Sequence, residues 1–287
     1  IKSRPMVFEV RDLWPEVPVA IGALQNKGLI YMAKRLEKSA YKNASQVVAL
    51  SPGMKEGVVR TGYSKDRVHM IPNSSDMNLF DVPEGEGIRF REHRDWLGDR
   101  PLVIYAGTFG QINKVGYLVK VAAEMKKIAP EVRFLLVGRG KEEDEIKSLA
   151  EELGVLNVNL FMPGKLPKEE MPPLFSAADI TTSTCLNIKE VWANSANKFF
   201  DGLASGTPVA INYSGWQAEV LQKNDAGLVL SPYNHADAAK RLFERLSDKN
   251  WLKKAGENAK KLAEEEYNRN LLAKKLENAL KKAVANA

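Results

Sequence analysis

Short apolar segments of four to six residues recur between longer polar or amphipathic segments from residue 6 to residue 230. The centres of these segments are apolar rather than alternating, which is typical of strands buried on both faces of a parallel sheet. Helices fit most of the intervals, so the pattern predicts an α/β fold built from repeated βα units. The expected strands are 6–10, 47–50, 67–71, 102–106, 132–137, 158–162, 179–182, 208–211 and 227–230.

Helices are expected where apolar residues recur at helical spacing. In residues 26–43 this spacing is kept by Leu29, Met32, Ala33, Leu36 and Ala40. Further helices are expected to start at Ser51-Pro52 and to fill residues 236–287.

A polar stretch rich in turn formers, residues 81–87, separates three early strands from six later ones. Three strands make half of a doubly wound sheet, whereas six make a complete Rossmann-like one. We therefore predict a partial N-terminal α/β domain in residues 1–84 and a complete C-terminal domain in residues 85–265. A C-terminal helix, 266–287, is expected to follow, and one arrangement open to it is to cross back to the N-terminal domain.

The composition is typical of a globular protein, with 44% hydrophobic and 27% charged residues among 287. No apolar run approaches the roughly 20 residues needed to cross a bilayer, and we recognise no signal peptide. One cysteine, Cys185, fits a reducing compartment, so a cytoplasmic protein is expected. Three scattered histidines and the absence of any Asp-x-Asp pair predict no metal site.

The net charge of +6 is uneven, because residues 1–80 carry twelve Lys and Arg against seven Asp and Glu. No nucleic-acid recognition motif accompanies this excess, so we expect no nucleic-acid partner. Lysines crowd one face of the helix expected at 26–43. A solvated face is one interpretation, and peripheral contact with an anionic membrane, on the inner face of the plasma membrane, is the other. These lysines are Lys27, Lys34, Lys38 and Lys42.

Residues 194–211 (NSANKFFDGLASGTPVAI) combine a polar loop, a short helix, a glycine stop and a buried strand. We expect Asn194 and Ser195 to cap the helix at its N-terminus. We expect Gly206 to end it in a left-handed conformation. An ordinary helix–strand unit is the alternative interpretation.

The start of this helix would attract anions, phosphate above all. The amides of Ala196, Asn197 and Lys198 would point out of the helix N-terminus, where the helix dipole favours negative charge. Lys198 adds a positive charge, and Asp201 adds an acceptor-only carboxylate that suits sugar hydroxyls.

Loops after three other strands carry further candidate residues. Gly107 and Gly110 let the backbone approach a ligand closely, and Lys114 can reach a phosphate. Gly138 starts a loop that resembles half of a dinucleotide fingerprint on the wrong strand, with a plain tight turn as the alternative. Leu166 can offer backbone amide and carbonyl groups to a flat base. These loops converge on one rim of one sheet, which predicts a ligand with a base, a ribose, a diphosphate and a polyol.

Arg11 and Asp12 follow the first strand of the chain. In open α/β sheets this carboxyl edge is where ligands bind, so both residues are site candidates. A local ion pair at the strand end is the alternative.

Three segments resemble motifs of glycosyltransferase family 4, which has the retaining GT-B fold. Residues 168–179 (KEEMPPLFSAAD) look like the helix that precedes the donor site in that family. Residues 201–209 (DGLASGTPV) look like the second half of its Glu-x7-Glu motif. Residues 71–80 (IPNSSDMNLF) look like its interdomain signature. The resemblance spans nearly the whole chain.

Three further phrases resemble the bacterial branch that moves N-acetylated amino sugars, fucosamine-like ones included, in surface-polysaccharide assembly. They are 10–15 (VRDLWP), 194–201 (NSANKFFD) and 211–216 (INYSGW). The resemblance implies a retaining, metal-independent transferase without a cofactor, which takes a UDP-linked donor and a lipid-linked or saccharide acceptor. A UDP-HexNAc 2-epimerase and a non-catalytic nucleotide-sugar-binding subunit are the alternatives.

The resemblance also implies roles by position. Lys114 matches the basic residue that holds the donor diphosphate, and Thr108 stands where many relatives have a second basic residue. Leu166 matches the backbone that recognises the nucleobase, and residues 196–198 match the helix start that holds the diphosphate. Asp201 replaces the family's second Glu, which holds the ribose.

Two positions depart from the family pattern. Ala193 stands where the first Glu is expected, and Asn194 or Glu190 is the candidate substitute. Arg11 stands where many relatives carry a histidine near the transferred sugar, with Asp12 beside it, so the acid/base group stays open. The expected catalytic residues are Arg11, Asp12, Lys114 and Lys198. The expected donor-binding residues are Gly107, Thr108, Gly138, Leu166, Asn194, Ser195, Ala196, Asn197, Lys198 and Asp201.

The resemblance implies which domain does what. Residues 85–265 would bind the nucleotide-sugar donor, and residues 1–84 would be the end of the acceptor domain. Family members need two facing domains, so we interpret the chain as a piece of a longer enzyme that binds donor without being competent in transfer.

Overall fold

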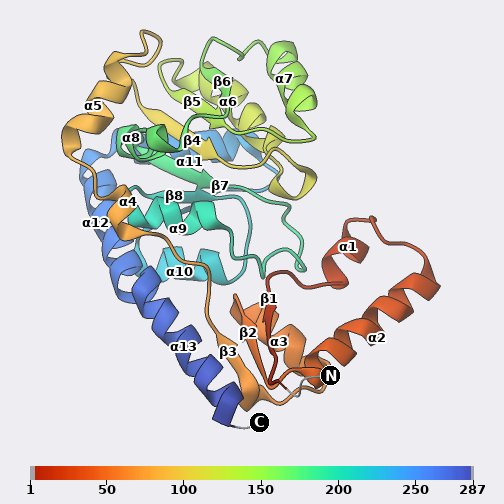
Figure 1. Ribbon diagram of the computed structural model, residues 1–287. Coiled ribbons are helices and arrows are strands. Elements are labelled where there is room, and N and C mark those ends of the chain that lie inside the picture. Colours follow the sequence, from red (N-terminus) through yellow and green to blue (C-terminus); the bar gives the residue numbers. More distant parts are fainter. Residues whose placement is uncertain (1–3, 286–287) are drawn as a thin grey trace. The chain divides into compact units, whose positions relative to one another are not determined.

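The computed structural model describes residues 4–285, and the chain forms two compact units (Figure 1). The first unit comprises the chain up to Ser74, Ile188–Ser195 and the chain from Tyr267 onwards. The second comprises Ser75–Asn187 and Ala196–Glu266. These limits differ from the domain limits expected at 84/85 and 265/266, which stay predictions.

The first unit contains a parallel three-stranded sheet in the order β1-β2-β3. The strands are β1 (Val7–Val10), β2 (Gln46–Ala49) and β3 (Val68–Met70). The helices are α1 (Glu16–Ala20), α2 (Lys27–Asn43), α3 (Pro52–Arg60), the 3-10 turn η1 (Lys65–Arg67) and α13 (Arg269–Ala285). All three expected strands are present, and α13 packs against β1 and β2.

Local capping chemistry starts the two longer helices between these strands. The Asn26 side chain accepts a hydrogen bond from the Leu29 amide at the start of α2. The Ser51 hydroxyl accepts one from the Met54 amide, and Pro52 occupies the first turn of α3. The start predicted at Ser51-Pro52 is therefore confirmed.

The second unit contains a parallel six-stranded sheet in the order β6-β5-β4-β7-β8-β9. Counted from β4, this is the strand order 3-2-1-4-5-6 of a doubly wound dinucleotide-binding sheet. The strands are β4 (Leu102–Ala106), β5 (Arg133–Val137), β6 (Leu160–Gly164), β7 (Ile180–Ser183), β8 (Val209–Ile211) and β9 (Gly227–Val229). The predicted parallel α/β fold is confirmed.

Helices cover this sheet in two groups (Figure 1), with α6 contacting α7 and α11 in one, and α12 contacting α9 and α10 in the other. The first group is α6 (Gly116–Ile128), α7 (Glu143–Glu152) and α11 (His235–Ser247). The second group is α8 (Met171–Ala177), α9 (Asn197–Ala204), α10 (Trp216–Asn224) and α12 (Lys249–Glu266). The remaining short elements are α4 (Met77–Phe80), α5 (Glu84–Glu92) and the 3-10 turns η2 (Gln111–Asn113) and η3 (Lys168–Glu170).

The core under the first group explains why β4, and β5 after its first residue Arg133, are apolar. Val103, Tyr105, Phe134 and Leu136 alternate onto this face and are buried against α6, α7 and α11. Their neighbours Ile104 and Leu135 are equally buried on the other side. A strand covered on both sides has no polar face to show, which is the pattern that the sequence displays.

Helix α9 is held close to the sheet by a glycine and ended by another. A Cβ at Gly202 would lie 2.4 Å from the Thr181 hydroxyl and 2.8 Å from a Val209 methyl, so only glycine lets the helix approach β7 and β8 this closely. Gly206 has a φ of +70°. The amides of Gly206 and Thr207 bond back to the carbonyls of Leu203 and Gly202, which is a Schellman motif. The stop predicted at Gly206 is confirmed.

Within residues 4–285 no helix combines the length and the apolar character that crossing a bilayer requires.

Candidate functional site

The loops after β4 and β7 meet where the strand order of the second sheet reverses. The Thr184 hydroxyl donates to the Asn113 carbonyl over 2.8 Å, and the Leu186 amide donates to the Ile112 carbonyl over 2.8 Å. In open parallel sheets the crevice at this reversal, outside the carboxyl ends of the strands, is where ligands bind. These bonds fix the shape of the crevice wall.

Lys198 lies at this reversal, in the first turn of α9. Its Nζ donates to Asn113 Oδ1 over 2.7 Å and lies 5.4 Å from the centre of the Tyr105 ring. Burial lowers the pKa of Lys198 to about 8. Lys198 forms no ion pair with a carboxylate in the part of the chain that the structure describes. An anion bound here would supply the missing counter-charge.

The start of α9 differs from the predicted capping. The N-cap residue is Ala196, and no side chain caps the helix, so the capping predicted for Asn194 and Ser195 is wrong. The Ser195 hydroxyl instead accepts a hydrogen bond from the Asn73 amide over 3.1 Å, and Asn194 Nδ2 donates to the Val191 carbonyl. With no side chain taking them, the first amides of α9 can serve an external acceptor.

Asp201 follows Lys198 by one helical turn. Its carboxylate accepts a hydrogen bond from the Ser75 hydroxyl over 2.9 Å. Burial raises the pKa of Asp201 to about 6, and the Ser75 hydrogen bond acts in the opposite direction. Asp201 is therefore ionised at neutral pH and keeps lone pairs for further donors.

A Ser75→Ala substitution should move the titration of Asp201 to higher pH, because it removes the hydrogen bond that lowers this pKa. If Asp201 accepts from a ribose, nucleotide affinity should fall as the pH drops through about 6, and Ser75→Ala should shift that fall upward. Calorimetric UDP titrations across this range measure the shift. Ser75→Thr keeps a hydroxyl and serves as the control, and coincident profiles for both variants and the parent would contradict the assignment.

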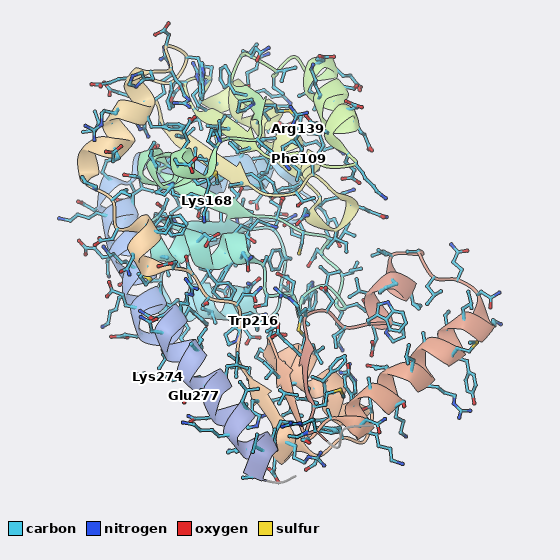
Figure 2. The ribbon with its side chains drawn as sticks, in the orientation of Figure 1. Phe109, Arg139, Lys168, Trp216, Lys274 and Glu277 are labelled. Carbon is cyan, nitrogen blue, oxygen red and sulfur yellow. The ribbon has the colours of Figure 1, made fainter. Side chains whose placement is uncertain are left out.

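Four of the expected residues line one pocket of about 230 Å³: Gly107, Thr108, Gly138 and Leu166. Arg139 lines it too. The Phe109 amide donates to the Arg139 carbonyl, and Figure 2 shows both side chains near the top of the molecule. The pocket has the size and the backbone groups to accept a flat ring.

Glycine is required on the wall of this pocket. A Cβ at Gly138 would lie 1.8 Å from the Gly107 carbonyl oxygen, and its φ is +148°. The loops after β4 and β5 therefore approach more closely than any side chain would allow, which explains the fingerprint-like glycine on this strand.

Lys114 does not line the same pocket. Its φ is +50°, and it lines a separate cavity of about 640 Å³ together with Tyr117, Asn187 and Tyr233. The preceding residue, Asn113, accepts the hydrogen bond from Lys198. Lys114 therefore follows directly after the residue that holds Lys198, the group expected to bind the anion. The role of Lys114 stays a prediction.

Arg11 and Asp12 belong to the first unit, directly after β1. Arg11 Nη1 lies 3.7 Å from Glu9 Oε1, which is the local ion pair that the sequence left open. Desolvation raises the pKa of Asp12, and Arg11 opposes this rise. Their roles also stay predictions.

Three residues at the site escaped the sequence analysis: Ser75, Tyr105 and Asn113. Ser75 lies in the segment resembling the interdomain signature, and Asn113 lies beside Lys114, so both had a local signal. In the sequence, Tyr105 is recognisable only as part of a buried strand. Asn113 contacts a residue 85 positions away and Ser75 contacts one 126 positions away, and no local pattern reveals such contacts.

No group of three or more His, Cys, Asp or Glu side chains in residues 4–285 is arranged to hold a metal ion. Metal independence stays a prediction.

The strand order and the crevice at its reversal place the chain in the class of doubly wound α/β proteins, in which ligands bind at this point. Comparison with known proteins gives the family. The chain belongs to the family described as "Glycosyl transferases group 1", whose model matches residues 88–262. Its fold is that of the GT-B glycosyltransferases.

Curated relatives are distant. The chain is 25% identical over 240 residues to the D-inositol 3-phosphate glycosyltransferase of Nocardia farcinica, covering 81% of this chain and 49% of that protein. It is 21% identical over 230 residues to the alpha-D-kanosaminyltransferase of Streptomyces kanamyceticus, covering 79% and 58%. The chain thus spans about half the length of the curated relatives that it matches.

Solved structures agree on the fold. Anabaena Alr3699/HepE in complex with UDP and glucose matches with a TM-score of 0.80 at 20% identity, over 97% of this chain and 72% of that one. WaaG, a glycosyltransferase involved in lipopolysaccharide biosynthesis, matches with a TM-score of 0.74 at 15% identity, over 96% and 75%.

Proposed function

We propose that the second unit binds a UDP-sugar donor for a retaining transfer of an N-acetylated amino sugar. The acceptor is a lipid-linked or saccharide molecule of bacterial surface-polysaccharide synthesis. The observation that carries the donor assignment is the partly buried Lys198, without a carboxylate partner in the described chain, at an uncapped helix start. Family membership favours a transferase over the epimerase and the non-catalytic binder.

The roles follow from the chemistry of each group. Lys198 and the first amides of α9 hold the diphosphate, and Asp201, one turn on, accepts from ribose hydroxyls. The pocket of Gly107, Thr108, Gly138 and Leu166 takes the base. Neighbours of known structure support uridine, because HepE is described in complexes with UDP and with UDP-glucose.

Catalysis would be mainly electrostatic. When the sugar leaves, negative charge develops on the diphosphate, and preorganised amides and an ammonium group stabilise it. An oxygen of the leaving phosphate takes the proton of the acceptor hydroxyl, so the reaction needs neither a metal ion nor a glycosidase-type carboxylate pair.

Calorimetric titration of this chain with UDP, UDP-GlcNAc, GDP, ADP and NAD tests the donor assignment. Binding of UDP and UDP-GlcNAc in preference to the other nucleotides is expected. Preference for GDP or ADP would contradict uridine, and no nucleotide binding at all would contradict the donor site. Donor-dependent product formation by the longer protein tests the transfer itself.

We also propose that α2 contacts an anionic membrane surface. Leu29, Met32 and Leu36 are between 53% and 64% exposed on this helix. Its one acidic residue, Glu37, is buried, so the exposed charges of α2 are all positive. Exposed apolar residues among lysines are typical of a helix that lies in the interface of an anionic bilayer.

Substituting Leu29, Met32 and Leu36 together by Gln should reduce binding to phosphatidylglycerol vesicles by about tenfold or more, because the buried apolar area is lost. Co-sedimentation at low and high salt measures this binding. Leu280→Gln with Val284→Gln, on the exposed face of α13, is the matched control. Equal binding by both variants, or none by the parent chain, would end the membrane proposal.

A further inference from the structure

A second cationic pocket lies in the first unit, away from the carboxyl edge of its sheet. Its volume is about 450 Å³. It opens between the C-terminal part of α2 and the turn that joins α3 to η1, near the amino ends of β2 and β3. The lining residues are Lys38, Tyr41, Lys42, Thr61, Gly62, Tyr63, Ser64 and Arg67.

The charges of this pocket are unbalanced. Three cations line it, and no carboxylate does. Lys38 and Lys42 are one helical turn apart, and Lys34 continues the row by another turn. Like charges at this spacing destabilise a helix, so the row opposes the local stability of α2. Neither Lys38 nor Lys42 forms an ion pair with a carboxylate of residues 4–285.

Arg67 forms a rigid wall. Its Nε donates to the Ser45 carbonyl over 2.9 Å, and its Nη2 donates to the Ala44 carbonyl over 2.6 Å. The guanidinium also lies 4.9 Å from the centre of the Tyr63 ring, whose hydroxyl donates to the Ala44 carbonyl. The geometry of the guanidinium is thus fixed by the two carbonyls and the Tyr63 side chain.

The turn that precedes Arg67 adds an open, polar part of the wall. The Ser64 hydroxyl makes no hydrogen bond within the described residues. Gly62 has a φ of +94°, and a Cβ built there would meet nothing within 4 Å. A group of moderate size can therefore enter beside Ser64 and reach the cations.

We propose that this pocket binds a phosphate group, held by the two lysines of α2, the Arg67 guanidinium and the Ser64 hydroxyl. Two ammonium groups, a fixed guanidinium and a hydroxyl are the donors that tetrahedral oxyanions select. The helix dipole explains Lys42, which lies in the last turn of α2, but not Lys38 one turn earlier. Arg67 is held by the Ala44 and Ser45 carbonyls, which places a third positive charge beside the two lysines.

This site is independent of the donor site. It belongs to the first unit, whereas Lys198 and Asp201 belong to the second. The phosphate can come from a free phosphate ester or from the headgroup of a phospholipid. The two sources share the same chemistry in the pocket and differ only in what the phosphate is attached to.

Amide NMR spectra of the whole ¹⁵N-labelled chain locate the site. Titration with inorganic phosphate and with glycerol 3-phosphate should shift the Gly62, Ser64 and Lys42 signals in a saturable way, whereas sodium chloride at equal ionic strength should not. Shifts at Asn197 and Lys198 would report anion binding at α9 separately, so failure of one site does not hide the other.

Lys38→Ala with Lys42→Ala should weaken this phosphate binding by about tenfold or more. Lys274→Ala with Lys275→Ala, on the exposed face of α13, makes the same charge change in the same unit and should have no effect. Figure 2 labels Lys274 beside Glu277 on that helix. Each pair leaves the second unit unchanged.

Vesicles distinguish the sources. Because α2 also carries the proposed membrane contact, competition rather than loss of vesicle binding separates the two sources. If the pocket takes a headgroup, saturating glycerol 3-phosphate should release the parent chain from phosphatidylglycerol vesicles and should not affect the vesicle binding that the Lys38/Lys42 variant retains. If it takes a free ester, glycerol 3-phosphate shifts the pocket signals and leaves vesicle binding by the parent chain unchanged. Shifts that sodium chloride reproduces, or equal losses of phosphate affinity in both variants, would overturn the proposal.

Discussion

Replacing Lys198 with Met should weaken UDP binding by about 10- to 100-fold, the usual cost of losing a hydrogen bond to a charged group. Met keeps the apolar part of the side chain, so the packing beside Tyr105 survives while the charge is lost. Calorimetric titration gives the affinity directly. Lys147→Met, on the exposed side of α7, is the matched control and should bind UDP as the parent chain does.

The same lysine predicts a pH dependence. Because burial lowers the pKa of Lys198 to about 8, part of the unliganded protein carries a neutral amine at slightly alkaline pH. A bound diphosphate favours the ammonium form, so UDP binding near pH 8 should take up protons and its affinity should fall as the pH rises further. Calorimetry in buffers of different ionisation enthalpy measures the uptake. Unchanged affinity in Lys198→Met, with no proton uptake in the parent, would contradict this diphosphate site.

A Glu37→Gln chain should be more stable than the parent at pH 8 and should lose this advantage at pH 5. Glu37 is 9% exposed, and its Oε1 has no hydrogen-bond partner in residues 4–285, as is true of Glu16 Oε2. Burial raises the pKa of Glu37 to about 7, and the negative charge of Glu16 adds to this rise. Tyr41, Lys34 and Arg60 act in the opposite direction.

The direction follows from proton binding. Between the unfolded pKa of 4.5 and the folded value of about 7, the folded chain holds a proton that the unfolded chain releases. The free energy of unfolding therefore falls as the pH rises through this window, by at most about 3 kcal/mol. Glutamine does not titrate in this window, so the free energy of unfolding of the Glu37→Gln chain should not fall in the same way.

Urea unfolding midpoints at both pH values measure the difference. Glu56→Gln, on the exposed side of α3 in the same unit, removes an equal charge without burial and should leave the parent's pH dependence intact. Parallel pH profiles for Glu37→Gln and the parent would show that Glu37 is ionised throughout and solvated.

The strands could be predicted because burial on both faces leaves a signal in every residue. Residues 102–106 are apolar throughout and residues 134–137 form an apolar run after Arg133, and both segments became interior strands of the second sheet. Gly206 could be predicted to end α9 because a helix stop depends on backbone conformation within three residues. Such features depend only on residues close together in the sequence.

The site was harder because its contacts join distant segments. Ser195 has the side chain of a helix cap, yet its hydroxyl is used by Asn73, 122 residues earlier. A local sequence pattern cannot show that a distant amide competes for the Ser195 hydroxyl, and for this reason the capping prediction was wrong. Asn113 is similar: nothing in its loop indicates that it positions Lys198.

The close packing of α9 against the sheet has a consequence for the kinetics of donor binding. Because Gly202 brings the helix against Thr181 and Val209 without a gap, the helix start cannot slide or tilt without a steric clash. The groups proposed to bind the diphosphate are therefore in place before a nucleotide arrives. Capture at this helix should be governed by diffusion and charge steering, and differences in residence time should come from the dissociation rate.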